Sequence, residues 1–390
     1  MAFDLAEGLA GTGAPRMPAP VRPPPRARRP SWKAVAWQVL AMLSVAGLIA
    51  WGAHNAGDAL ARRNIGVDFA FLLNPAGFDI PFKLTDWQSS DTYGRALWVA
   101  GLNTVLAAAL AIVLATVLGL GLALLRVSAN PLAAGVARAV VELVRNTPQL
   151  LQVVFWYFAV LQVLPGPRAS LSLSDAVFLN VRGLFFPAPL SPAFGWMLVG
   201  GAALALVLPR LLPRRSLLLT AGAPVLVALV LAAAQTGWEL PAMRGFNFAG
   251  GWRLPPELLA LVLGVGIYTA AFVSENMRAS IGAVGHGQRE AARSLGLPPG
   301  RTMRLVVLPQ ALRTLLPPLT SHYLNIIKST TLGAAVAYPE ILQIFARTVL
   351  NQSGRAIETM TLVLGVFLAV NLGVSALMNR WDRRLALQSR

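Results

Sequence analysis

Eight apolar stretches, each close to the length that crosses a lipid bilayer, constrain the fold of this chain more than any other sequence feature. A hydrocarbon core of about 30 Å needs about 20 helical residues. Hydrophobic residues make up 56% of the chain and charged residues 13%, which is more apolar surface than a soluble fold can bury. We therefore predict an all-α polytopic membrane protein with about eight transmembrane helices, at about 34–53, 98–125, 148–164, 193–209, 216–235, 256–276, 314–337 and 358–378.

The basic residues favour one orientation of these helices. Arginine and lysine in short loops accumulate on the cytoplasmic side of a membrane. With the N-terminus in the cytoplasm, the cytoplasmic segments hold 22 basic and 5 acidic residues, whereas the outer segments hold 10 of each when Glu257 and Glu358, at the outer ends of their spans, are counted with them. The whole net charge of +17 then lies on one side, and both termini are cytoplasmic. Membrane topology explains the basic composition, and we expect no nucleic-acid partner.

The N-terminal part divides into three segments. Residues 1–33 are predicted to form a disordered cytoplasmic tail, because they are rich in proline and arginine and show no apolar period. The stretch 34–53 is predicted to be a membrane helix, followed by an outer loop at 54–97. A cleaved signal peptide is the alternative, but the apolar run is longer than the roughly 7–15 residues of a signal-peptide core. At the other end, residues 379–390 are expected to form a cytoplasmic tail.

The cytoplasmic loop at 277–313 has the pattern of two short helices joined by a tight elbow. Residues 288–295 are good helix formers, and Gly296 follows where a helix ends in a left-handed residue. A second helical turn can start after Pro299, and we expect Pro309 to end it. Such a pair of helices, presented between two membrane spans, can dock on a partner protein.

This loop resembles the EAA loop of ATP-binding-cassette (ABC) importer permeases. Glu290-Ala291-Ala292 is followed after three residues by Gly296, and after nine more by Val306 to Pro309. The spacing is that of the family, with valine in place of isoleucine at position 306. In that family the loop forms coupling helices that sit in a groove of the ATPase. The resemblance implies a coupling loop that includes Gly287, Gln288, Glu290, Ala291, Ala292, Gly296, Leu308 and Pro309.

Further runs narrow the resemblance to permeases for polar amino acids. They are residues 142–152 (E-x-x-R-x-T-P-x-L-x-Q), 268–278, 287–292 (G-Q-x-E-A-A), 309–311 (P-Q-A) and 328–332, with Asn146 in place of the usual glycine and Thr331 in place of serine. The resemblance covers about 98–378 and implies a type I ABC importer transmembrane-domain core, whose simple members have five spans. The helix at 34–53 and an inserted helix pair at about 193–235 are then additions. This layout resembles the larger permease of general L-amino-acid importers.

The resemblance also implies a function and a set of partners. The chain would be the permease subunit of an ATP-driven importer that moves L-amino acids, polar ones with broad specificity, across the inner membrane of a bacterium. Its partners would be two copies of an ABC ATPase, a second related permease subunit and a periplasmic amino-acid-binding protein, besides membrane lipid. ATP hydrolysis would belong to the ATPase, because none of the three lysines follows a glycine, as a phosphate-binding loop requires.

Lys328 is the candidate for the substrate pathway, because a charge inside a membrane span is costly and marks functional positions. Asn325 and Thr331 share its region of the seventh span. Lys328 can equally snorkel outward or meet a backbone carbonyl. Pro317 and Pro318 either break this span beside a cavity or form a plain kink.

Other chemistry has little support in the sequence. There is no cysteine, and His54, His286 and His322 are too scattered for a metal site. No arrangement of residues suggests a catalytic site, and we expect no cofactor in this chain. The arginines of the coupling loop either set the topology or contact acids of the partner. An ion-coupled secondary transporter of small polar solutes is the alternative function, and a membrane scaffold without transport is a third.

The inserted helix pair places its connecting loop in the cytoplasm, which a fusion reporter can test. A reporter fused after residue 212 should read as cytoplasmic, because residues 210–215 carry three arginines and no acid. The control is a fusion after residue 180, in the predicted outer loop, which should read as periplasmic. A periplasmic signal at residue 212 would remove the inserted pair of spans.

Overall fold

The computed structural model describes residues 32–62, 67–128, 130–191, 193–211, 222–235 and 237–387. The chain divides into two compact units, residues 1–67 and 68–390, and each unit is described by itself. Most of the predicted disordered tail at 1–33 lies outside the described residues, and so does the connecting loop at 212–221.

Among its described residues, the first unit is essentially one long helix, α1 (Trp32–Arg62). This helix includes the apolar stretch 34–53 and continues beyond it to Arg62. The window Val35–Gly52 is long and apolar enough to cross a membrane. None of that window is buried within the unit, so its apolar side chains need lipid or another protein as their neighbour.

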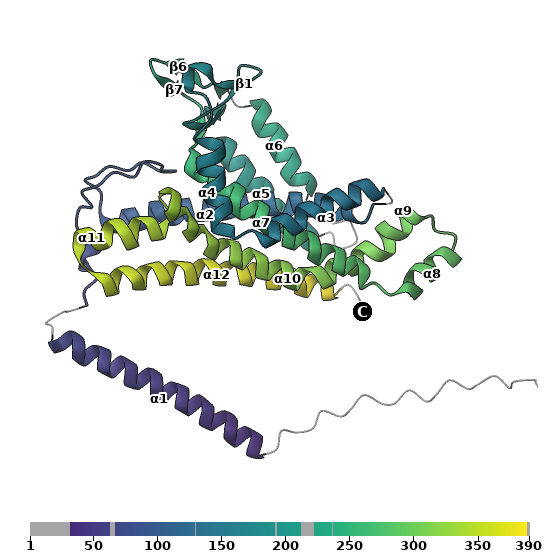
Figure 1. The fold of residues 1–390 in the computed structure, drawn as a ribbon, viewed down its shortest axis with the longest axis horizontal. Coiled ribbons are helices and arrows are strands. Elements are labelled where there is room, and N and C mark those ends of the chain that lie inside the picture. The colour runs from purple at the N-terminus through teal and green to yellow at the C-terminus, as the bar shows by residue number, and fades with distance from the viewer. Residues whose placement is uncertain are drawn as a thin grey trace, which may run out of the picture. The chain divides into compact units, whose positions relative to one another are not determined.

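The second unit is mostly helical, and its long helices run side by side. Its helices and helical turns are η1 (Ala70–Leu73), α2 (Tyr93–Arg126), α3 (Pro131–Asn146), α4 (Gln149–Val154), η2 (Phe155–Leu161), η3 (Pro167–Ala169), α5 (Ala193–Leu211), α6 (Ala223–Gln235), α7 (Pro256–Gly282), α8 (His286–Ser294), α9 (Pro299–Thr302), η5 (Met303–Val307), α10 (Leu308–Ser329), η6 (Thr330–Val336), η7 (Leu342–Val349), α11 (Leu350–Ser353) and α12 (Ala356–Leu387). Figure 1 shows α8 and α9 at one end of this bundle and α11 at the other.

The number of membrane spans stays a prediction. Every predicted apolar stretch overlaps a described helix. Within the described residues, however, four helices are long and apolar enough to cross a membrane: α1, α2, α7 and α12. The helical segment Gln149–Leu161 and the helix over Ala223–Ala234 are apolar but shorter. The structure therefore supports a mostly helical membrane protein.

Small residues let α2 and α7 pack closely. The side chains that α2 buries are mostly alanines, among them Ala111 and Ala115, and a Cβ atom added to Gly119 would lie 2.7 Å from Cγ1 of Val273 and 3.0 Å from the carbonyl oxygen of Ala270. Lipid tails are as apolar as leucine, so membrane helices associate by close van der Waals packing rather than by burying apolar surface from water. The small residues of α2 provide that close approach.

A buried polar cluster fixes the segment after η6 to α2. The side-chain amide of Asn103 donates to the carbonyl oxygen of Pro339 at 2.9 Å, and the hydroxyl of Tyr338 donates to the carbonyl oxygen of Asn103 at 2.9 Å. The hydroxyl of Thr104 accepts a hydrogen bond from the Ile341 N–H at 3.1 Å. These bonds give hydrogen-bond partners to buried backbone groups around Pro339, where the chain is not helical. Such groups need partners within the protein, because no water is available to them there.

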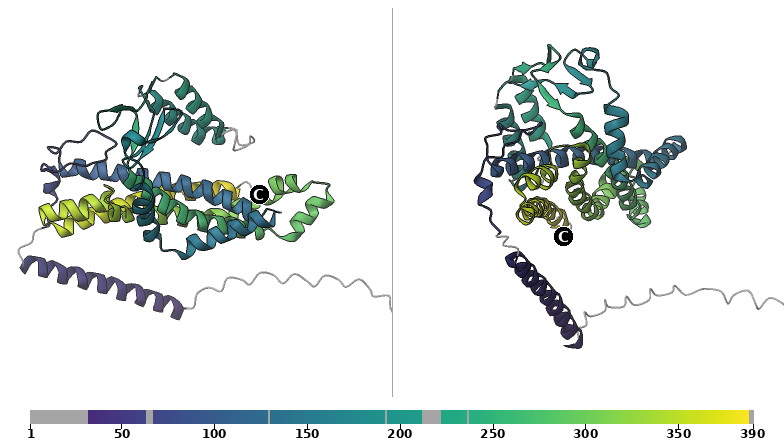
Figure 2. Two further views of the ribbon diagram at one scale, coloured as in Figure 1. Left: turned by 45° about the horizontal axis from the view of Figure 1, so that its top comes forward. Right: turned by 60° about the vertical axis from the view of Figure 1, so that its left-hand side comes forward.

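The prediction of an all-α chain is wrong in one region. Eight short strands lie on either side of the inserted helix pair: β1 (Leu171–Leu173), β2 (Val177–Asn180), β3 (Gly183–Phe186), β4 (Ala188–Pro189), β5 (Trp238–Glu239), β6 (Ala242–Arg244), β7 (Asn247–Ala249) and β8 (Trp252–Leu254). They form a four-stranded sheet in the order β1-β2-β3-β8, the pair β4-β5 and the hairpin β6-β7. We call residues 165–191 and 237–254 the β cap. Figure 2 shows its strands gathered at one end of α5 and α6.

The strands were not expected because each is too short to show an alternating apolar pattern. They have two to four residues, and their decisive pairing joins segments on opposite sides of the insertion, Leu184 with Leu254 and Phe186 with Trp252. Such pairing depends on the position of the flanking helices, so local sequence does not specify it.

The second helix of the loop at 277–313 does not end at Pro309, contrary to the expectation. Residues 299–329 form one continuous helix through α9, η5 and α10. The turn η5 is π-helical, and the Leu308 N–H bonds to the carbonyl oxygen of Met303, five residues earlier. This wider turn changes the hydrogen-bond register directly before Pro309, whose missing N–H is tolerated there. Pro317 and Pro318 also lie inside α10.

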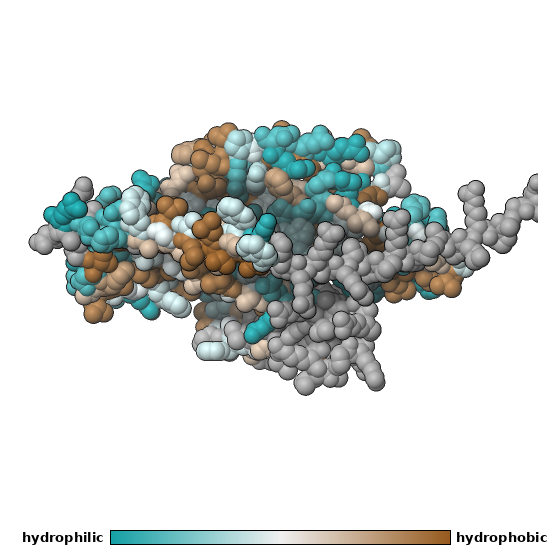
Figure 3. Space-filling model, turned by 90° about the horizontal axis from the view of Figure 1, so that it is seen from below, coloured by the Kyte–Doolittle hydropathy of each residue, from teal (hydrophilic) through white to brown (hydrophobic). Residues whose placement is uncertain are grey.

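Outward-facing side chains of the long helices are apolar. On α12, Leu364, Leu368 and Leu372 are 70%, 59% and 60% exposed, and their spacing of four residues puts them on one face. Figure 3 shows hydrophobic side chains in broad patches on one side of the molecule. Patches of this kind are covered by lipid or by another membrane protein.

Substituting Gly119 tests the close packing of α2 on α7. The Gly119→Ala variant should lose about 1–3 kcal/mol of stability, because the added methyl group overpacks the contact with Val273 and Ala270. Gly121 is the matched control, since a Cβ added there meets nothing within 4 Å. Gly121→Ala should be neutral or gain roughly 0.5–1 kcal/mol, the usual preference for alanine in helices. Thermal unfolding of both variants in detergent measures the difference, and equal unfolding temperatures would contradict the packing argument.

Candidate functional site

The loop at 277–313 forms the predicted elbow around Gly296. This residue has φ +72°, the left-handed conformation that favours glycine. Its N–H donates to the carbonyl oxygen of Arg293 at 2.9 Å, and the Leu297 N–H donates to that of Ala292 at 3.1 Å. The two bonds form a Schellman motif, which satisfies carbonyl groups at the end of α8 and reverses the chain. A Cβ atom at position 296 would meet nothing within 4 Å, so the requirement for glycine is one of backbone conformation.

Most of the predicted coupling residues form an exposed surface. Glu290 is 68% exposed and lies 3.5 Å from His286 through its carboxylate. Exposed with it are Gly287, Gln288, Ala291, Gly296 and Pro309. Ala292 is instead buried, at 3% exposure, and Leu308 is half-buried. These two residues pack inside the loop, while the others are free to contact a partner.

Arg289 joins α8 to the helix bundle. Its guanidinium Nη2 donates to the carbonyl oxygen of Ile281, near the end of α7, at 2.7 Å. The other arginines of the loop, Arg293, Arg301 and Arg304, are exposed. The sequence alone could not separate these roles, because all four arginines occur in a loop with the same surplus of positive charge.

A hydrophobic cluster connects the loop to three long helices. Its residues come from the cytoplasmic-loop end of α2, α7 and α10 and from the turn between them: Ala123, Met277, Ile281, Val284, Val307, Ala311 and Leu315. An ion-paired group lies beside it. The carboxylate of Glu275 binds the guanidinium groups of Arg126, on α2, and Arg278. The turn after α7 and the π-helical turn before α10 are therefore packed together with α2, α7 and α10 in one contiguous cluster.

Lys328 and Asn325 lie on an exposed face of α10. They are three residues apart, which places them on one side of the helix, and Ser321 continues that face. Within the described residues, no carboxylate lies within ion-pair distance of the Lys328 ammonium. The Thr331 hydroxyl donates to the Lys328 carbonyl oxygen at 2.8 Å, so this threonine stabilises the change from α10 to η6.

Several residues of the family-like runs 142–152, 268–278 and 328–332 contact one another or α10 in three dimensions. The side-chain amide of Asn276, on α7, is 2.6 Å from Nε2 of His322. The Ser329 hydroxyl donates to the Gln149 side chain at 3.1 Å, and the Arg145 guanidinium lies 5.0 Å from the ring centre of Phe272. Single polar residues in apolar helices carry no spacing signal, so these contacts could be found only in three dimensions. They connect α7 with α10, α10 with α4, and α3 with α7.

Metal binding has no structural basis in the described part of the chain. Among those residues, no three histidine, aspartate or glutamate side chains lie close enough together to hold a metal ion. His322 contacts Asn276 instead, and His286 contacts Glu290.

Known proteins are similar in sequence to this chain over most of its length. The chain matches a family described as "Binding-protein-dependent transport system inner membrane component" over residues 115–387. It is 45% identical over 380 residues to the putative amino-acid ABC transporter permease protein YhdX of Escherichia coli, covering 93% of this chain and 96% of that protein.

Two other relatives are similar over nearly their whole length. The general L-amino acid transport system permease protein AapQ of Rhizobium johnstonii is 38% identical over 93% of this chain and 94% of its own. The glutamate/glutamine/aspartate/asparagine transport system permease protein BztB of Rhodobacter capsulatus is 34% identical over 90% of this chain and 93% of its own. The similarity thus includes the β cap and the inserted helices as well as the family core.

Proposed function

Because this chain belongs to the binding-protein-dependent inner membrane components of ABC transport systems, we propose that it carries L-amino acids, polar ones with broad specificity, across a bacterial inner membrane. It is the permease subunit, and a partner ATPase hydrolyses ATP. The names of the three relatives support the substrate class, since each refers to amino acids. The observation that carries the proposal is the exposed α8 surface around Glu290, followed by the glycine elbow. The family match removes the support for an ion-coupled secondary transporter.

The proposed topology has eight membrane spans with both termini in the cytoplasm. Its support is the one-sided distribution of charge and the overlap of each apolar stretch with a helix. The family core lies at about 98–378, and α1 and the α5–α6 pair are additions to it. In this orientation α8 and α9 face the cytoplasm, whereas the β cap faces the periplasm.

We propose that two ATPase subunits dock on the coupling loops of this chain and of a second, related permease. Glu290 and Ala291 contact the ATPase, and Gly296 holds the elbow that presents them. When ATP closes the ATPase pair, α8 moves, and Arg289 with the hydrophobic cluster moves α7 and α10. The helices then open toward the periplasm, where a binding protein releases the amino acid.

The substrate pathway runs along the polar face of α10. Lys328 and Asn325 are exposed on it, and a charged side chain on a membrane helix is retained where it meets substrate or water. His322, paired with Asn276, borders the same face. An amino acid passing this face offers its carboxylate to the Lys328 ammonium.

The coupling role of the elbow is tested by Gly296→Pro. Proline fixes φ near −65° and has no N–H, so this variant loses both the left-handed turn and the bond to Arg293. We expect the ATPase to copurify with the wild-type chain from gently solubilised membranes and to be lost from Gly296→Pro. Gly296→Ala, which costs roughly 1–2 kcal/mol of backbone strain, should keep part of the ATPase.

Gly354→Pro is the matched control for that experiment. Gly354 has φ +66°, its N–H bonds to Leu350, and it follows α11 at the opposite end of the bundle from α8 (Figure 1). The variant suffers the same backbone change but should keep the ATPase. A Gly296→Pro chain that retains normal ATPase activity in the eluate would contradict the coupling role.

The pathway role is tested by Lys328→Ala in an uptake assay. We expect uptake of radiolabelled L-glutamate or L-glutamine to fall about tenfold or more, because one charge-assisted hydrogen bond contributes about 1.5–3 kcal/mol. ATPase copurification should be unchanged. Lys83→Ala is the control, since Lys83 pairs with Asp79 in the segment before α2. Unchanged uptake in Lys328→Ala, at equal expression, would remove this lysine from the pathway.

A further inference from the structure

The β cap has an open sheet edge, and this limits where it can lie. Strand β1 pairs with β2 on one side, has no strand on its other side among the described residues, and all three of its residues are exposed. Open sheet edges do not occur in the hydrocarbon region, because their backbone groups would have no hydrogen-bond partner. This edge of the cap therefore lies in water or against another protein, and the side chains beside it are not lipid-facing.

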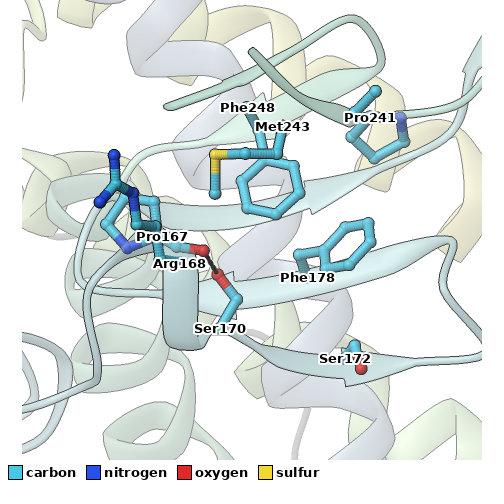
Figure 4. A pocket seen from close by; sticks show the side chains of 9 residues that line it. Pro167, Arg168, Ser170, Ser172, Phe178, Pro241, Met243 and Phe248 are labelled. Carbon is cyan, nitrogen blue, oxygen red and sulfur yellow. Dashed lines mark hydrogen bonds between the residues drawn. The ribbon is translucent and has the colours of Figure 1, made fainter. Parts of the chain in front are cut away.

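A pocket opens beside this edge, between β1–β2 and the hairpin β6–β7. Its volume is about 330 Å³. The floor is apolar: the rings of Phe178 and Phe248 are stacked with centres 4.4 Å apart, and Met243 and Pro241 lie next to them. Figure 4 shows Arg168 at one side of these rings.

Arg168 is the only charged residue of the pocket lining, and it has a free guanidinium within the described part of the chain. Its guanidinium lies 5.3 Å from the ring centre of Phe246, and no acidic side chain of the described residues is within ion-pair distance. The neighbouring Ser170 hydroxyl is already used, because it donates to the Pro167 carbonyl oxygen and accepts from the Asn180 amide. Arg168 therefore offers the pocket a positive charge for an incoming carboxylate.

Large apolar side chains surround the pocket and face outward. Phe246 is 77% exposed, and Leu171 and Leu173 on β1 are 56% and 69% exposed. Exposed apolar groups near a pocket that holds an arginine, a methionine and two phenylalanines have the composition of the central part of a protein–protein interface.

The charge of the cap indicates an acidic partner. Its residues include four arginines, no lysine, one aspartate and one glutamate. The tendency of basic residues to stay in the cytoplasm does not account for arginines in a periplasmic loop. The segment 67–92, by contrast, holds four aspartates and one lysine, so the cap and this segment have opposite net charge.

We propose that the Arg168 pocket of the β cap is a docking site for the periplasmic substrate-binding protein, which inserts an apolar side chain onto the phenylalanine floor and pairs a surface carboxylate with Arg168. The inference rests on the proposed function, which puts the cap on the periplasmic side. The family description itself requires a binding protein to meet this class of chain. A free amino acid fits less well, because the lining has no acidic group for its ammonium.

The test is the affinity of the binding protein for the complete complex. The permease pair with its ATPase is placed in lipid nanodiscs, and the labelled amino-acid-binding protein of the same system is titrated by fluorescence anisotropy. Arg168→Glu should weaken binding about tenfold or more, as loss of a central interface arginine does, and Phe246→Ala should weaken it in the same direction. Arg182→Glu is the matched control, since Arg182 is an exposed arginine of the cap outside the pocket lining. It should change the affinity less than threefold.

Each other result contradicts the inference in a recognisable way. Equal weakening by Arg168→Glu and Arg182→Glu would mean a diffuse attraction of charges and no specific pocket. If Arg168→Glu bound the binding protein with wild-type affinity, the docking site would be overturned. The proposed function would still stand in that case, because the ATPase is present in the purified complex. Direct binding of a radiolabelled amino acid that Arg168→Glu abolishes, without any change for the binding protein, would assign the pocket to free substrate. A complex without ATPase would overturn the proposed function and this inference with it.

Discussion

The close contact between α2 and α7 is the interaction on which the rest of the structure depends. The hydrophobic effect does not drive helices together inside a bilayer. The contact between α2 and α7 is therefore stabilised by van der Waals packing, which requires their backbones to approach closely. Gly119 and the alanines of α2 permit that approach. Near the start of the same helix, Asn103 and Thr104 hold the segment around Pro339, and near its end Arg126 binds Glu275. α2 thus fixes the position of both ends of the bundle.

The packing of α2 against α7 sets the position of the coupling loop. The loop continues α7 and runs into α10, so its two helices start from a contact that is already fixed. The hydrophobic cluster includes Ala123 of α2, and Arg289 bonds back to α7. In the proposed mechanism, a partner that moves α8 acts on this packed group of helices through the bond between Arg289 and Ile281.

Features that depend on local backbone chemistry could be predicted from the sequence. The left-handed turn at Gly296 is one of them, because a helix followed by glycine and proline has few other conformations. The prediction that the helix ends at Pro309 was wrong, because the π-helical turn before this proline changes the hydrogen-bond register. No sequence pattern indicates such a turn. The burial of Ala292, the contact of His322 with Asn276 and the strands of the β cap depend on neighbours distant in the chain. Of the candidate site, the exposed coupling surface was therefore foreseeable, whereas its internal contacts were not.

The pairing of β3 with β8 brings the two ends of the insertion together. Leu184 and Leu254 are partners in the sheet, so the chain leaves the bundle and returns to it at neighbouring points. The segments before and after the insertion are thus held together by strand pairing as well as by the chain that connects them. In the proposed topology the β cap and the loop at 277–313 lie on opposite sides of the membrane, so the proposed docking of a binding protein and the proposed docking of the ATPase use separate parts of the chain.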